Sequence, residues 1–281
     1  MKFYSKDKCS YFIILLVSLF ISANTFGQNK NKRTVKIRVL TYNIYHGATM
    51  NYDFDLSRIA KVIDSLKPDI VALQEVDFKT NRARKMDLMT ELGHLTGLSP
   101  LFGRAMYYDE GEYGEGILSR YSFVQTKRNL LAYSENHEPR AALEVLIKLS
   151  SGDTIRFVGT HLDHTENAVD RNNQCAEINR LYAKNDYPSI LAGDLNAIPD
   201  SKAINLLKTI WTISDNYSKA TFPSNKPERK IDYIMYRPKK QWKVLEHKII
   251  QDEIASDHCA VFAILELSLK NCNYPVNLKA Y

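Results

Sequence analysis

Four strand-like apolar runs of this chain each end in polar side chains of the kinds that carry chemistry. The runs lead into Asn43, Glu75, His161 and the pair Asp194 and Asn196. A rigid sheet holds side chains at strand ends to the tolerance that catalysis needs, and the loops beyond leave room for a substrate. One such residue is explained more simply as a turn former, but four runs together indicate an active site.

Two further motifs place charged groups beside apolar runs. Asp232 lies within Lys230–Ile234, where an ionised carboxylate costs several kcal/mol unless it is paired. Asp257 and His258 come directly before the last strand-like run. We expect His258 to be the partner of Asp232, because a carboxylate beside an imidazole fixes its tautomer and raises its pKa. Together these residues predict hydrolytic chemistry.

The remaining pattern predicts an α+β fold with more strand than helix. Helical spacing occurs from Leu56 to Leu66, with Asp55 as the N-cap, around Leu88–Leu95, and in Ala168–Leu181. Residues rich in Val, Ile, Leu, Phe and Tyr predict strands at Val35–Tyr42, Asp69–Val76, Gly116–Ser119, Arg140–Leu149, Thr154–His161, Ser189–Gly193, Ile231–Tyr236, Val244–Ile250 and Ala260–Leu269. These strands occur both in succession and separated by helices. This favours two packed mixed sheets with helices outside over a doubly wound parallel sheet.

The first 27 residues differ in kind from the rest. Three Lys precede the apolar run Tyr11–Ile21, which is too short to span a bilayer and is followed by small and polar residues. This predicts a signal peptide, 1–27, cleaved near Gly27, rather than a buried N-terminal helix. Cys9 lies before the apolar run, so no lipoprotein-type anchor is expected. Residues 28–281 are expected to form one exported, periplasmic or extracellular domain, a monomer without a stable membrane anchor.

Charge and cysteine content narrow the function classes. The chain of 281 residues carries 38 basic and 32 acidic side chains; without the three Lys and one Asp of residues 1–27, 35 and 31 remain, a net charge of +4. A non-specific nucleic-acid binder usually has a basic stripe, which is missing here. Cys175, Cys259 and Cys272 show no zinc spacing and allow at most one bridge.

The motifs resemble those of the endonuclease/exonuclease/phosphatase superfamily, whose fold is similar to that of pancreatic-type DNase. Seven pieces occur in the expected order: Thr41–Ile44, Leu73–Asp77, Gly116–Arg120, Thr160–Asp163, Gly193–Asn196, Ile231–Ile234 and Ser256–His258. Each is weak alone, and the ordered set is highly specific. The resemblance implies a four-layer sandwich of two mixed sheets flanked by helices. It also implies divalent-metal-dependent cleavage of a phosphoester.

The resemblance also implies a role for each residue. Glu75 corresponds to the main ligand of Mg²⁺, or of Mn²⁺ as an alternative, with Asn43 and Asp257 as direct or water-mediated ligands. Asp194 would orient or deprotonate the attacking water, and Asn196 would hold a phosphate oxygen. His161 and His258, the latter paired with Asp232, would act in acid–base catalysis or stabilise charge in the transition state. Which of the two histidines serves as the acid stays open.

Peripheral residues bear on the substrate. Arg140 and Arg171 are candidate phosphate ligands, although Arg140 is almost as well explained by an ion pair with Glu138 or Glu144. Aromatic and acidic residues share an expected loop before Gly116, and the acids count against a duplex substrate. We therefore expect a small or lipid-head-group phosphomono- or diester as substrate. The alternatives are a secreted endonuclease that cleaves DNA or RNA, and a catalytically silent binding module.

Overall fold

The computed structural model describes residues 33–184, 186–215 and 219–269, all within one compact unit, Lys32–Tyr281. The predicted signal peptide and Cys272 lie outside these residues, so both predictions stay as stated. None of the helices in the described part is long and apolar enough to cross a membrane.

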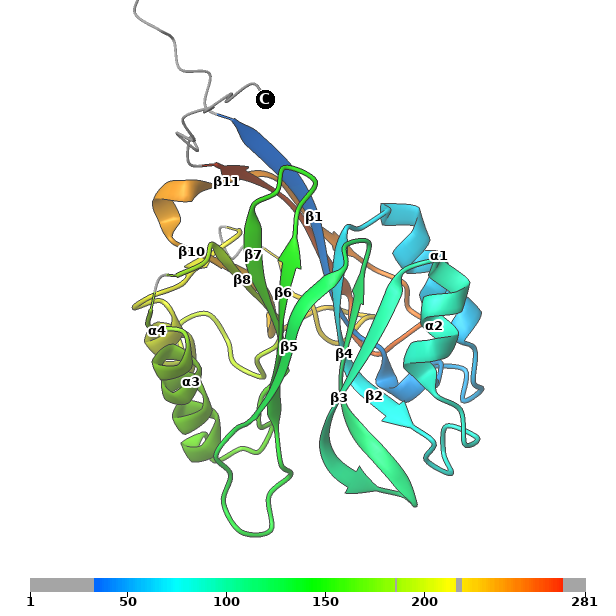
Figure 1. Cartoon of the computed structure of the whole chain (residues 1–281). Coiled ribbons are helices and arrows are strands. Elements are labelled where there is room, and N and C mark those ends of the chain that lie inside the picture. The colour runs from blue at the N-terminus through cyan, green and yellow to red at the C-terminus, as the bar shows by residue number, and fades with distance from the viewer. Residues whose placement is uncertain (1–32, 185, 216–218, 270–281) are drawn as a thin grey trace, which may run out of the picture. The chain divides into compact units, whose positions relative to one another are not determined.

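Two six-stranded mixed sheets form the centre of this unit (Figure 1). Only β1 with β2 and β7 with β8 pair in parallel; the other named pairs of strands are antiparallel. The first sheet has the order β11 (Trp242–Ile250), β12 (Ala260–Ser268), β1 (Thr34–Asn43), β2 (Ile70–Phe78), β4 (Gly111–Ser119) and β3 (Ser99–Tyr108). The second has the order β5 (Phe123–Leu130), β6 (Ala141–Lys148), β7 (Thr154–His161), β8 (Ser189–Asp194), β10 (Asp232–Arg237) and β9 (Thr212–Ile213).

Helices cover the outer face of each sheet. Helices α1 (Leu56–Leu66) and α2 (Leu88–Thr96) pack on the first sheet, and α3 (Val169–Leu181) and α4 (Lys202–Leu207) pack on the second (Figure 1). Asp55 caps α1 as predicted, because its carboxylate accepts the Ser57 N–H. Two short 3₁₀ turns, η1 (Tyr45–Gly47) and η2 (Lys239–Gln241), complete the described helices. The predicted four-layer sandwich is confirmed.

Strand β1 shows why the central strands have apolar residues on both faces. Ile37 and Val39 point into the layer between the sheets, and Leu40 and Tyr42 point outward into the layer beneath α1 and α2. Side chains alternate along a strand, so a strand covered on both faces carries an almost continuous apolar run. The apolar run of β1 ends at Asn43, the last residue of the strand, so this polar side chain lies where the strand leaves the sheet.

The structure corrects two local predictions. The expected loop before Gly116 is a hairpin of β3 and β4, whose turn residues Asp109 and Glu110 both have positive φ, 47° and 57°. A two-residue turn of this kind matches the twist of the strands it joins. Strand β5 was not predicted, because most of its residues are exposed and polar.

Cys175 and Cys259 are buried free thiols, so these two do not pair with each other.

Candidate active site

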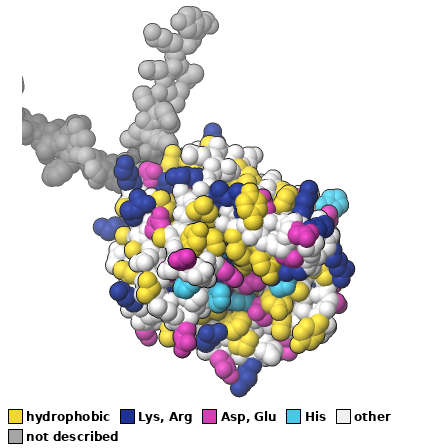
Figure 2. Space-filling model, turned by 90° about the horizontal axis from the view of Figure 1, so that it is seen from below, with side chains coloured by type: hydrophobic (Ala, Val, Ile, Leu, Met, Phe, Trp, Pro, Cys, Tyr) yellow, Lys and Arg dark blue, Asp and Glu magenta, His cyan; other side chains and the backbone are white. Residues whose placement is uncertain are grey.

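The polar strand ends of both sheets meet at one end of the unit. Asp194 is the last residue of β8 and lies in register with His161 on parallel β7 and with Asp232 on antiparallel β10. The first sheet contributes the end of β1, the segment before β12, and Glu75 of β2. The sequence placed Glu75 at the end of a strand-like run, whereas it lies inside β2, three residues before the strand ends at Phe78. Figure 2 views this end, where histidine side chains gather among acidic ones near the centre.

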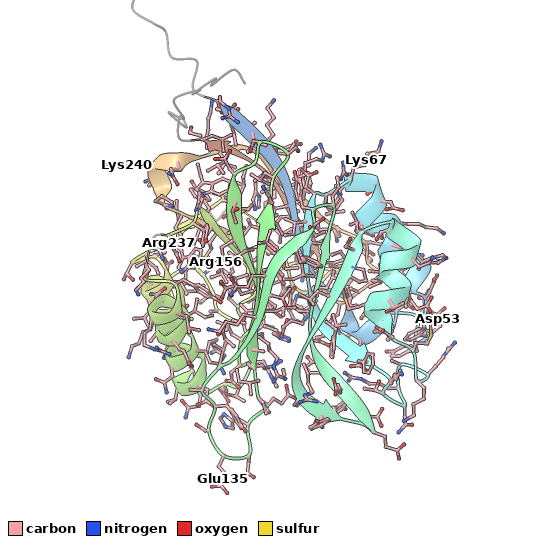
Figure 3. All side chains as sticks on the ribbon, viewed as in Figure 1. Asp53, Lys67, Glu135, Arg156, Arg237 and Lys240 are labelled. Carbon is pink, nitrogen blue, oxygen red and sulfur yellow. The ribbon has the colours of Figure 1, made fainter. Side chains whose placement is uncertain are left out.

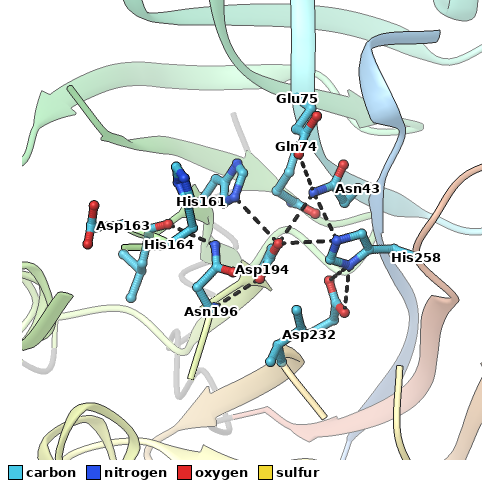
Figure 4. Close-up of polar contacts among 12 residues, drawn as sticks. Asn43, Gln74, Glu75, His161, Asp163, His164, Asp194, Asn196, Asp232 and His258 are labelled. Carbon is cyan, nitrogen blue, oxygen red and sulfur yellow. Dashed lines mark hydrogen bonds and ion pairs between the residues drawn. The ribbon is translucent and has the colours of Figure 1, made fainter. Parts of the chain in front are cut away.

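Asp194 is the centre of the site (Figure 4). Its Oδ2 lies 3.3 Å from Asn43 Nδ2, 3.4 Å from His161 Nε2 and 3.6 Å from His258 Nε2. Its Oδ1 accepts the backbone N–H of Asn196 at 2.9 Å. Burial, followed by the nearby Asp232 carboxylate, raises the pKa of Asp194 to about 7. The raised pKa makes this carboxylate a stronger proton acceptor than an exposed aspartate.

The predicted pair of Asp232 and His258 is present. His258 Nδ1 lies 3.2 and 3.1 Å from the two carboxylate oxygens of Asp232, and both side chains are buried. Burial lowers the pKa of His258, but the carboxylates of Asp232 and Asp194 outweigh it and raise this pKa to about 10. The imidazole is consequently protonated and cationic at neutral pH.

His161 has the opposite character. A guanidinium N–H of Arg140 donates to His161 Nδ1 over 3.1 Å, and because a guanidinium cannot accept, Nδ1 must be the unprotonated nitrogen. The ring proton then sits on Nε2, which faces Asp194. Burial, reinforced by the charge of Arg140, holds the pKa of His161 well below its usual range. The two histidines thus differ at neutral pH: His161 is a neutral donor and His258 is a cation.

Glu75 and Asp257 form the acidic side of the site. The register of β2 against β4 shifts between Leu73 and Val76, and Glu75 within this bulge has φ 57°. Non-glycine residues adopt such angles mainly where the surroundings enforce them, often at functional sites. Burial raises the pKa of Glu75, but His46, His161 and Asn43 together outweigh it and lower this pKa to about 2. Glu75 is therefore a carboxylate over the whole physiological range.

These carboxylates suit a divalent cation. Glu75 and Asp257 line the same pocket, and burial together with the charge of Glu75 raises the pKa of Asp257. A hard cation between two such oxygen donors would relieve that repulsion. Asn43 lies beside Glu75: its amide oxygen accepts the Tyr45 N–H, and its amide nitrogen donates to Glu75 Oε1 over 3.0 Å. In this arrangement Asn43 orients Glu75.

The pocket encloses about 360 Å³ and is lined by His161, Asp194, Asn196, Asp257 and His258, together with Glu75 and Arg140. Arg140 belongs to the pocket and also pairs with Glu138, 2.8 Å away, whereas Glu144 pairs with Arg156. The predicted ion pair with Glu138 is present, and the role of Arg140 as a phosphate ligand stays a prediction.

Arg171 does not belong to the pocket lining, contrary to the sequence prediction. Its guanidinium donates to the backbone oxygens of Asp163 and Thr165 at 2.8 and 3.0 Å. Helical position alone could not distinguish a loop-binding arginine from a phosphate ligand.

Several residues beside the site are not among the predicted site residues, although Tyr113 is one of the aromatic residues of the expected loop before Gly116. Tyr113 lines the pocket and lies 3.5 Å from His161 Nδ1, and His46 Nδ1 lies 3.6 Å from Glu75. Glu115 is 1 % exposed, and neither carboxyl oxygen has a hydrogen-bond partner among the described residues. Its position between two glycines of a strand-like run was the one available signal.

Known proteins resemble this chain in sequence and in structure. YbhP of Escherichia coli strain K12, described as uncharacterized, is 27% identical over 216 residues, which cover 70% of this chain and 83% of YbhP. An endonuclease/exonuclease/phosphatase family protein of Bacteroides thetaiotaomicron superposes with a TM-score of 0.71 at 19% identity, covering 84% of this chain and 100% of that one. The mannosyl-6-phosphatase of the same organism gives 0.67 at 19% identity, covering 82% and 99%.

The model of the Endonuclease/Exonuclease/phosphatase family matches residues 40–258, a span that begins on β1 and ends at His258. The matched span contains every residue placed above in the candidate site. The chain therefore belongs to the endonuclease/exonuclease/phosphatase family, whose members hydrolyse phosphoesters.

Proposed function

We propose that this chain is an exported, Mg²⁺-dependent hydrolase of a small or lipid-head-group phosphomono- or diester. The observation that supports this most strongly is the convergence of Asn43, His161 and His258 on one oxygen of Asp194, beside the carboxylates of Glu75 and Asp257. A site of this kind combines a proton acceptor, donors for a developing anion and oxygen ligands for a cation.

Each residue has a distinct part in the proposed reaction. Asp194, with its pKa of about 7, takes the proton of the attacking water. Neutral His161 keeps its Nε2 proton and donates a hydrogen bond with it. Cationic His258 stabilises negative charge that develops on the phosphate oxygens and is the imidazole that can supply the proton needed by the leaving oxygen. Glu75 and Asp257 would hold Mg²⁺, which draws charge from the phosphate when it is bound. Asn196 is fixed by its bond from Nδ2 to the Leu162 oxygen, and a remaining amide N–H is available to a phosphate oxygen.

The charge around the pocket favours a small substrate. Three arginines line the pocket. Arg82 pairs with Asp77 over 2.7 Å and Arg140 pairs with Glu138 over 2.8 Å, whereas the Arg229 guanidinium lies over the Phe222 ring. Glu135 lies in the loop between β5 and β6, which also carries the pocket residues Glu138 and Arg140. Figure 3 shows Lys67 and Lys240 at the opposite end of the unit from Glu135. A long polyanion needs a track of unpaired basic side chains, whereas one phosphoester needs only a few donors.

A panel of phosphoesters tests the proposal. Monoesters, diesters, sugar phosphates, a phospholipid head group and plasmid DNA are assayed with Mg²⁺, with Mn²⁺ and with EDTA. The proposal predicts metal-stimulated turnover of at least one small ester, loss of that turnover in Asp194→Asn, and its retention in Asp200→Asn, an exposed acid on the next loop. Efficient cleavage of DNA alone would establish the endonuclease alternative, and no turnover of any ester would contradict hydrolysis.

A further inference from the structure

A second cluster of acidic and imidazole side chains lies outside the active site. His137 belongs to the loop between β5 and β6, Asp163 follows β7, and Asp170 is in the first turn of α3. One ligand-type atom from each residue lies within 4.8 Å of the other two. Figure 4 shows Asp163 apart from the residues gathered around Asp194. Three separate segments thus bring metal-binding side chain types to one place.

The bonds within the cluster leave one carboxyl oxygen without a partner. Asp170 accepts the N–H and the hydroxyl of Ser134 at 2.7 and 2.6 Å, and its Oδ2 lies 2.7 Å from His137 Nδ1. Asp163 Oδ1 accepts the N–H and the hydroxyl of Thr165. Asp163 Oδ2 has no hydrogen-bond partner among the described residues, although this side chain is only 1 % exposed.

That oxygen is the observation that points to a ligand. A buried carboxylate is costly unless a donor or a cation compensates it. The nearby cation Arg171 gives its bonds to the backbone oxygens of Asp163 and Thr165 and none to the carboxylate. Asp163 and Asp170 therefore place two buried carboxyl groups beside one imidazole, and no cationic side chain among the described residues bonds to Asp163 Oδ2.

We propose that His137, Asp163 and Asp170 form a second divalent-cation site, suited to Zn²⁺. One imidazole nitrogen and two carboxylate oxygens form a ligand set typical of zinc, and three protein ligands leave a position for water. The 29% exposure of the His137 side chain leaves the cluster open to solvent on that side. The site does not depend on the proposed hydrolase activity.

A cation bound by His137, Asp163 and Asp170 would stabilise one wall of the active-site pocket. His137 immediately precedes Glu138, and Arg140 follows two residues later; both line the pocket. The same loop is also held by Gln174, which accepts the Asp163 N–H and donates to the Ala132 oxygen. Because these bonds remain without the ion, the loop is expected to fold in the metal-free protein, and the cation adds rigidity.

Zinc stoichiometry tests the site. The active site offers its own cluster, Asp194, Asp232 and His258, so the measurement is the change in bound Zn²⁺ per chain after dialysis against buffered Zn²⁺. We expect Asp163→Asn to lose one ion relative to wild type and Glu166→Gln, an exposed acid of the same loop, to lose none. The same comparison in the Glu75→Gln background is expected to give the same difference of one ion.

Thermal unfolding gives a second readout that needs no activity. Without metal, Asp163→Asn should melt at or above the wild-type temperature, because the substitution removes a buried carboxyl oxygen that has no hydrogen-bond partner among the described residues. With Zn²⁺, wild type and Glu166→Gln should rise in Tm, and Asp163→Asn should rise less. If Asp163→Asn does not fold, His137→Ala takes its place in both measurements. Equal zinc content and equal zinc-induced shifts in the variant and wild type would overturn the proposal, whatever the outcome of the phosphoester assays.

Discussion

At the scale of single residues, the candidate site is a set of buried charges that determine one another's protonation. The pairing of Asp232 with His258 could be predicted from the sequence, because a carboxylate inside an apolar run needs a partner. The orientation of the Asn43 amide and the part played by Arg171 could not, because both depend on backbone groups of other segments that no motif reveals.

Removal of the Asp232 charge should change the pKa of His258. We expect Asp232→Asn to lower the pKa of His258 from its raised value near 10, because its nearest carboxylate partner is lost. Turnover should fall at least about tenfold, since the cationic imidazole is then less populated. NMR titration of the ring measures the pKa, with exposed His164 as the internal control. An unchanged pKa would show that the charge of Asp232 does not govern this histidine.

The buried Glu115 should make the unfolding free energy of the chain depend on pH. Burial holds its pKa well above the ordinary value in the folded chain, so the unfolded chain releases this proton first and wild-type stability falls as pH rises above about 4.5. Glu115→Gln avoids that loss. Its advantage in unfolding free energy should be near zero at acidic pH and grow by up to about 1.4 kcal/mol per pH unit. Urea unfolding at several pH values, with Glu112→Gln on the same strand as control, measures it; a variant less stable than wild type at pH 8 would refute this account.

At the scale of elements, most of the site residues predicted from the sequence lie at or next to the ends of strands. Asn43 ends β1 and His161 ends β7, and each follows an apolar run. Because these strands are buried on both faces, their apolar runs predicted where the polar side chains of the site would begin. Strand β5 was missed because most of its residues are exposed and polar. The hairpin of β3 and β4 was missed because Pro100 and Gly103 interrupt the apolar run of β3, and glycine and glutamate alternate with few apolar residues in the first half of β4.

The close approach of β7 and β8 predicts a sensitive glycine. A Cβ at Gly193 would lie 1.9 Å from the Thr160 oxygen, so Gly193→Ala must push the strands apart next to Asp194. We expect a loss of about 3 kcal/mol, a fall in Tm of about 6–12 °C, and reduced turnover. Gly159→Ala is the matched control, since its Cβ would meet Ala72 Cβ at 3.3 Å and should cost about 1 kcal/mol. Similar melting temperatures for both variants would contradict this packing argument.

At the scale of the whole molecule, the formal net charge of +6 is modest for a chain of 281 residues. Composition alone could therefore argue against a non-specific nucleic-acid binder, whereas the pairing of Arg82 with Asp77 and the choice of Glu138 as the partner of Arg140 could be seen only in the structure.

This charge distribution predicts a shallow salt dependence. A protein that contacts six or more phosphates loses roughly 10³-fold in affinity between about 50 and 200 mM salt, whereas one or two contacts give a small change. We expect KM for a small phosphoester to vary little over that range. If DNA is cut efficiently and its KM rises steeply with salt, the small-substrate proposal fails.

The central claim is that Glu75 anchors a catalytic cation, and calorimetric titration of Mg²⁺ into Glu75→Gln tests it most directly. The substitution removes a ligand charge and almost no volume, so the fold should remain intact. Wild type and the control Glu166→Gln should bind Mg²⁺ and show metal-stimulated turnover, whereas Glu75→Gln should show greatly weakened binding and no stimulation. Undiminished Mg²⁺ binding and turnover in Glu75→Gln would contradict the account.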